Sequence, residues 1–213
     1  DGSSYTELLT CASGALETSK HKGKNKCTLY DEELIHTRLR SLEIMDRLRS
    51  SVMNHMEGFS VVYQPIVRSS DTKIAEAEAL LRWSCKDMGS VSPLEFIPLL
   101  ESSGLIIPVG KWVLEQSVRQ CCKWLACVPD FVMNVNCSYL QMLDEDFVQS
   151  VKEIINRYRL DPSHIVLELT ESRFVTDQDR LNDTFKRLRS LNIRLAMDDF
   201  GTGYSSLSCL SCT

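Results

Sequence analysis

From residue 59 onward, short apolar segments alternate with amphipathic segments, and this alternation restricts the folds that are open to the chain. Strands that alternate with helices pair in parallel through right-handed crossovers, so we expect an α/β fold. The segments that have the pattern of strands are "SVVYQPIV", "IAEAEALLRW", "FVMNVNCS", "HIVLELTES" and "RLAMDDF".

The first two strands differ from the others because only "RSSDTK" links them. Such a short link favours an antiparallel pair. The later strands are separated by helical patterns at residues 92–104, 107–125, 144–160 and 177–192. The fold is either a β/α barrel or an open doubly wound sheet, and the absence of G-x-G-x-x-G after the first strand favours an incomplete TIM-like barrel.

Two further segments precede this region. Residues 1–30 carry a helical pattern that ends near Gly23, followed by "CTLY", which could be a strand. Residues 31–58 are predicted to form a connector helix, with apolar residues at steps of three or four. That helix could form a dimer seam, although packing on its own domain is favoured.

Composition excludes several classes of protein. The 213 residues carry a formal net charge of -5, which argues against a general nucleic-acid surface. No apolar run approaches the roughly 20 residues that span a bilayer, and the first residues lack the pattern of a signal peptide. Of nine cysteines, only Cys209 and Cys212 have C-x-x-C spacing, so we expect reduced thiols in a cytoplasmic protein.

Oxygen-bearing side chains interrupt or end the apolar strands. They are Glu78, Asn136, Glu168 and the pair Asp198 and Asp199. In parallel β/α folds the carboxyl ends of the strands meet at one face, which would bring these groups together. Carboxylate and amide oxygens are the ligands that Mg²⁺ and Mn²⁺ prefer, and a cation would offset their mutual repulsion. These residues therefore indicate a divalent-metal site.

The adjacent aspartates allow one carboxylate to reach a first metal ion and the next to reach a second. Two metal ions about 3.5–4 Å apart suit in-line attack on a phosphodiester. Arg82, four residues after Glu78, is then placed to bind a phosphate bidentately.

Each of these residues also has an ordinary structural interpretation. Glu78 could lie at an edge or on a solvent face, and Asn136 could serve a turn. Glu171 could cap the following helix through its dipole, and the aspartate pair could open a turn or a helix. The metal site is favoured because these interpretations would all have to hold independently.

Six ordered segments resemble the EAL domain, the bacterial phosphodiesterase family that opens cyclic di-GMP. The resemblance covers residues 59–213, which would form the N-terminal part of such a domain. The matching segments are "YQPIV", "EALLRW", "PLEFIPLLESSGLI", "VNCS", "ELTES" and "DDFGTGYSSL".

The resemblance implies a modified TIM barrel with an antiparallel first strand, and metal-dependent hydrolysis of cyclic di-GMP to linear pGpG with Mg²⁺ or Mn²⁺. It implies that Glu78, Asn136, Glu168 and Asp198 are ligands of a first metal ion. Asp198 and Asp199 would face the second ion, so the catalytic carboxylates would be those of the two glutamates and the two aspartates.

The resemblance also assigns residues around the metal ions. Arg82 matches a contact to the substrate phosphate, and Gln64 matches a guanine or substrate contact. Glu171 matches the residue that stabilises the loop "DFGTGYSS", through which relatives couple dimerisation to metal binding. A homodimer formed through that region is therefore expected.

Residues 1–30 resemble the end of a GGDEF domain, the diguanylate cyclase family. The corresponding segment is "ASGALETSKHKGKN", in which Ser13, Glu17 and Ser19 depart from the family pattern. The cyclase motif itself is not in this sequence. The chain is thus expected to be part of a GGDEF–EAL signalling protein.

Family members have a later lysine, a later glutamate and a later glutamine that this sequence does not contain. We therefore expect a barrel truncated after about five strands. The alternative to a phosphodiesterase is a receptor or scaffold that binds cyclic di-GMP without cleaving it. An unrelated metal-dependent β/α enzyme would have to match six ordered motifs by coincidence.

We predict that this chain alone hydrolyses cyclic di-GMP very weakly or not at all, because part of the expected metal site is missing from it. The measurement is a hydrolysis assay with Mn²⁺. Turnover near that of an intact EAL domain would contradict the prediction.

Overall fold

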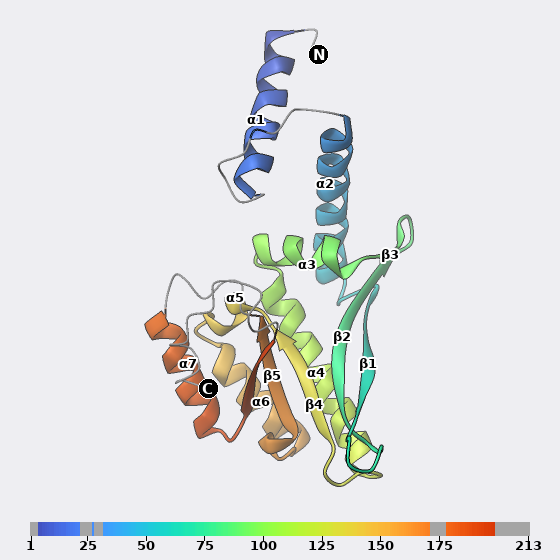
Figure 1. The fold of residues 1–213 in the computed structure, drawn as a ribbon, viewed down its shortest axis with the longest axis vertical. Coiled ribbons are helices and arrows are strands. Elements are labelled where there is room, and N and C mark those ends of the chain that lie inside the picture. Colours follow the sequence, from blue (N-terminus) through green and yellow to red (C-terminus); the bar gives the residue numbers. More distant parts are fainter. Residues whose placement is uncertain (1–3, 22–26, 28–31, 171–177, 199–213) are drawn as a thin grey trace. The chain divides into compact units, whose positions relative to one another are not determined.

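The computed structural model describes residues 4–21, 27, 32–170 and 178–198 (Figure 1). The chain divides into two compact units, Asp1–Arg47 and Leu48–Thr213. Helix α1 spans Tyr5–His21 in the first unit, and α2 spans Glu32–Met53 across the boundary. Apart from Cys27, the predicted strand "CTLY" lies outside the described residues.

The second unit is built on one six-stranded sheet. β1 and β2 pair antiparallel, as their short link predicts, and β2, β4, β5 and β6 pair in parallel in that order. Among the described strands the sheet ends at β1 and β6 and does not close. The strands are β1 (Phe59–Val67), β2 (Ile74–Cys85), β3 (Gly89–Val91), β4 (Val132–Cys137), β5 (Ile165–Thr170) and β6 (Arg194–Asp198).

Helices follow the strands where the amphipathic patterns predict them. Three short elements, β3, α5 and η1, were not expected, because three or four residues are too few to show a period. The helices of the second unit after α2 are α3 (Pro93–Ser102), α4 (Ile106–Leu125), α5 (Tyr139–Met142), α6 (Phe147–Tyr158), η1 (Pro162–His164) and α7 (Gln178–Ser190).

Helix α3 begins as its sequence predicts. The backbone N–H of Leu94 donates to Ser92 Oγ at 3.3 Å, and Pro93 occupies the first helical position, where no N–H is needed.

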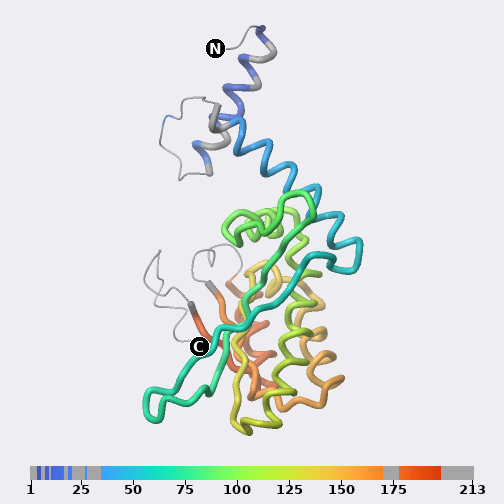
Figure 2. The backbone as a smooth tube through the Cα atoms, turned by 90° about the vertical axis from the view of Figure 1, so that its right-hand side faces the viewer, coloured from blue at the N-terminus to red at the C-terminus, as the bar shows by residue number. Residues whose placement is uncertain are grey.

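Helix α4 covers one face of the sheet. Tyr63 of β1 donates its hydroxyl to the carbonyl of Gln116 at 3.4 Å, and its ring lies 5.0 Å from that of Trp124, edge to face. Figure 2 shows α4 and α6 on the same side of the strands. The opposite face of the sheet therefore carries the side chains that these helices do not cover.

An aromatic cluster anchors the carboxyl end of β2. The Trp83 ring is 6.0 Å from Phe59 and 6.0 Å from Phe96, and its indole N–H donates to Ser51 Oγ at 3.1 Å. The hydrogen bond links the end of α2 to β2, because Ser51 lies in the last turns of that helix.

The turn that leads from α2 into β1 requires glycine at position 58. Gly58 has φ +79°, and its carbonyl accepts the backbone N–H of Ser84 at 3.1 Å. A Cβ built there would lie 2.1 Å from the carbonyl oxygen of Ser84. Backbone atoms of β2 cannot move aside without breaking the pairing with β1.

We predict that Gly58→Ala lowers the free energy of unfolding by about 2–4 kcal/mol. Gly104→Ala is the matched control, because Gly104 has φ +74° but open space around its Cβ position. That variant is expected to lose only about 1–2 kcal/mol. Urea denaturation measures both, and equal losses would show that contact with Ser84 is not what requires glycine.

Candidate functional site

Side chains of β2 point alternately to the helix layer and to the opposite side of the sheet, which we call the open face. Ala75, Ala77 and Ala79 are buried, whereas Glu76 and Glu78 between them are half-exposed. Successive side chains of a strand point to opposite faces, so both glutamates lie on the face that α4 does not cover. Small alanines on the other face allow the helix layer to approach.

Strand β4 places an asparagine next to Glu78. Met133, Val135 and Cys137 are buried toward the helices, and the alternation of the strand puts Asn134 and Asn136 on the other, open face, where Asn134 is also buried and Asn136 is exposed. The side-chain amide of Asn136 donates from Nδ2 to Glu78 Oε1 at 2.6 Å. This hydrogen bond joins two of the residues that the sequence analysis selected.

Strands β5 and β6 add further positions to the open face, beside Glu78 and Asn136. Glu168 is the direct register partner of Asn136, and it is half-exposed. Ala196 lies opposite Glu168, and Asp198, two residues later, ends β6 opposite Thr170. The backbone therefore puts the Asp198 position on the same face as Glu78, Asn136 and Glu168.

The remaining predicted residues are placed as follows. Gln64 is the cross-strand partner of Glu78 and is exposed on β1. Arg82 lies two pleats beyond Glu78 on the same face, and its Nη1 donates to the carbonyl of Leu81 at 2.9 Å. Asp199 and Glu171 lie outside the described residues.

The donor set on the open face suits a hard divalent cation. Of the two ends of the Asn136 amide, only the NH₂ group can donate, and it donates to Glu78 through Nδ2, so the carbonyl oxygen Oδ1 faces away from that bond as an acceptor. Carboxylate oxygens of Glu78 and Glu168 supply negative charge. No cluster of three or more His, Cys, Asp or Glu suited to a metal ion occurs within the described ranges.

In β4, β5 and β6 as the structure describes them, no cysteine side chain points to this face. Cys137 follows Asn136 but is buried on the helix side, and burial raises the pKa of its thiol. Burial also raises the pKa of Cys121 to about 12. The seven cysteines in the described part of the chain are all free.

Sequence analysis missed a second polar pair on the open face. Asn134 donates from Nδ2 to Glu76 Oε2 at 3.1 Å. The repeated alternation in "AEAEA" and "NVN" was the available signal, because it puts two glutamates and two asparagines on one face. Glu76 also lines a hollow of about 130 Å³ with Arg68 and Asp130.

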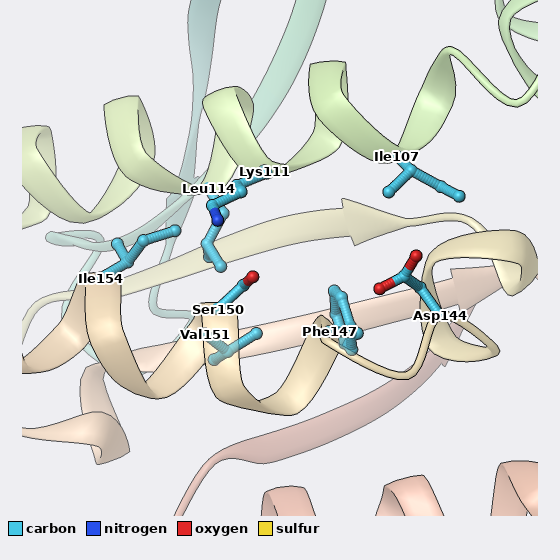
Figure 3. Close-up of a pocket in the computed structure, with 8 residues that line it drawn as sticks. All are labelled: Ile107, Lys111, Leu114, Asp144, Phe147, Ser150, Val151 and Ile154. Atoms are coloured by element: carbon cyan, nitrogen blue, oxygen red, sulfur yellow. The ribbon is translucent and has the colours of Figure 1, made fainter.

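A different hollow lies in the helix layer, between α4 and α6 (Figure 3). Its volume of about 30 Å³ is room for little more than a water molecule. Its lining is mainly apolar, with Lys111, Asp144 and Ser150 as the polar members. It is separate from the row of oxygen ligands, because that row lies on the face that the helices leave open.

Within the described segments, none of the helices combines the length and the apolar character that a bilayer crossing demands.

Comparison with known proteins gives a match to the EAL domain over residues 45–212. The bifunctional diguanylate cyclase/cyclic di-GMP phosphodiesterase MucR of Pseudomonas aeruginosa is 34% identical over 208 residues, which are 97% of this chain and 30% of MucR. Cyclic di-GMP phosphodiesterase PdeR of Escherichia coli is 31% identical, with 99% of this chain and 31% of PdeR covered. The chain thus spans about a third of the length of these relatives.

Comparison with solved structures also matches this chain to EAL-domain proteins. The PaMucR phosphodiesterase in complex with c-di-GMP has a TM-score of 0.73 and 36% identity, over 80% of this chain and 68% of that one. The EAL enzyme Bd1971, in its cAMP- and cyclic-di-GMP-bound form, has a TM-score of 0.75 and 29% identity, over 100% of this chain and 55% of that one.

Proposed function

Since this chain belongs to the EAL domain family, we propose that the protein that carries it hydrolyses cyclic di-GMP to linear pGpG in bacterial second-messenger signalling. The observation that carries the proposal is the hydrogen bond from Asn136 to Glu78, beside Glu168, on the open face of the sheet. Relatives that cover nearly all of this chain are named cyclic di-GMP phosphodiesterases.

Phosphodiesterases of this family depend on a divalent metal, and we assign Mg²⁺ or Mn²⁺ to this site. Glu78, Asn136, Glu168 and Asp198 would hold the first ion, and Asp198 with Asp199 would face the second. Bound there, such ions lower the pKa of water and neutralise the charge that develops on the phosphodiester.

The protein's own residues orient this donor set. The N–H of Asn136 holds one carboxylate oxygen of Glu78 and so limits the rotation of that side chain. Neighbouring strands fix the spacing of Asn136 and Glu168, because the two residues are register partners. A site carried by paired strands is more rigid than one carried by loops.

The substrate would approach from the open face of the sheet. Arg82 would bind a phosphate of the dinucleotide through its guanidinium. Gln64, on the neighbouring strand β1, would contact a guanine or another part of the substrate. The helices block the opposite face, where Tyr63 packs against α4.

We also propose a dimer, an order of domains and a location for the protein that carries this chain. Glu171 would stabilise the loop at residues 199–206, and a homodimer would form through the loop region at residues 198–206. Residues 1–30 would be the end of a GGDEF domain. Residues 31–58 would be the connector, in which the helix α2 ends at Met53 and not at residue 58 as predicted. We place the protein in the cytoplasm.

The test is hydrolysis of cyclic di-GMP with Mn²⁺ by the purified full-length protein that carries this chain, followed by chromatography of pGpG. Glu78→Gln should lower kcat/KM roughly hundredfold or more, because it removes a metal-binding charge. Glu145→Gln is the control, since the side chain of Glu145 is 88% exposed on a distant segment. Its activity should stay at the wild-type level.

Two outcomes would contradict the proposal. Hydrolysis that is unaffected by Glu78→Gln would show that the open face is not the active site. Tight binding of cyclic di-GMP without any hydrolysis would instead identify a receptor.

A further inference from the structure

The open face holds two amide–carboxylate pairs between the same two strands. Asn136 donates to Glu78 at 2.6 Å, and Asn134 donates to Glu76 at 3.1 Å. Each pair joins β4 to β2, and the second lies one pleat nearer the amino ends of the strands. The proposed function uses the first pair and leaves the second without a role.

The two asparagines differ in their surroundings. Asn134 is buried, with 4% of its surface exposed, whereas Asn136 is exposed. A buried amide without a hydrogen-bond partner lowers the stability of the fold, so its N–H groups are expected to donate to a nearby acceptor. In this structure that acceptor is Glu76.

The strand register places a second possible acceptor, the carboxylate of Glu78, beside Asn134. Asn134 is the direct partner of Glu78 in the pairing of β2 with β4, although it donates to Glu76. Side chains of register partners lie on the same face and close together. Without an acceptor at position 76, the amide of Asn134 would turn to the carboxylate of Glu78.

We propose that Glu76 is a positioning residue, which holds the amide of Asn134 and thereby leaves the Glu78 carboxylate to Asn136 and to a divalent cation. This inference rests on the proposed function for the cation. An ionised carboxylate has about four lone-pair sites on its two oxygens, and Asn136 already takes one of those on Glu78. A second amide N–H on Glu78 would therefore compete with a cation for the sites that remain.

Mn²⁺ binding, measured by electron paramagnetic resonance on the purified protein, tests the role of Glu76. Glu76→Ala should weaken Mn²⁺ binding about fivefold to tenfold, the effect of one hydrogen bond. Glu76→Gln should bind as the wild type does, because its carbonyl oxygen still accepts from Asn134. The double variant Glu76→Ala with Asn134→Ala should also recover wild-type affinity, because no amide then competes for Glu78.

Two controls separate positioning from other effects. Glu145→Ala removes an exposed carboxylate from a distant segment and should leave Mn²⁺ binding unchanged. Thermal unfolding shows whether each variant folds, and Glu76→Leu, which keeps volume without an acceptor, replaces Glu76→Ala if that variant is unstable.

Three results would overturn the inference. Glu76→Gln could bind Mn²⁺ as weakly as Glu76→Ala, which would mean that the charge of Glu76 matters and not its hydrogen bond. The double variant could fail to recover affinity, or Glu76→Ala could bind as the wild type does.

A metal-independent measurement distinguishes failure of this inference from failure of the proposed function. In a crystal structure of Glu76→Ala, the amide of Asn134 should donate to Glu78. If it stays turned away from Glu78, the inference is wrong whatever the metal does. If wild-type protein binds no Mn²⁺, the proposed function fails, and the orientation of Asn134 still decides the inference.

Discussion

The period-two alternation of β2 is the constraint on which the rest of the structure depends. Small alanines point to the helix layer, so the glutamates between them point to the face that the helices leave open. One residue of slip in the pairing with β4 would exchange the two faces and bury the glutamates. The hydrogen bond from Asn136 to Glu78 then ties the two strands together at the site.

One face of the sheet packs against the helices and stabilises the fold, and the other carries the residues of the candidate site. On the helix side, Tyr63, Trp124 and Phe131 pack edge to face, with neighbouring ring centroids 5.0 Å apart, and the residues of β4 that point there are buried. Polar and charged groups of β2, β4 and β5 collect on the other side. Substitutions on the helix side should therefore act through folding, and those on the open side should act through binding.

Much of the fold could be predicted from the sequence, because its strands and helices have clear periods. The antiparallel first pair followed from a six-residue link, and the cap at Ser92 followed from its position before Pro93. The strand β3 was missed, because three residues carry no period. For the site, motif positions predicted that Glu78, Asn136 and Glu168 share a face. The alternation in "AEAEA" and "NVN" puts Glu76 and Asn134 on the same face, but their hydrogen bond could not be predicted, because Asn134 donates diagonally to Glu76 and not to its register partner Glu78.

Anomalous diffraction from crystals grown with Mn²⁺ and cyclic di-GMP would locate the metal ion itself. We expect a Mn²⁺ peak on the open face of the sheet, about 2.1 Å from oxygens of Glu78, Asn136 and Glu168. A Mn²⁺ ion bound elsewhere, with these three side chains free of any ligand, would contradict this expectation.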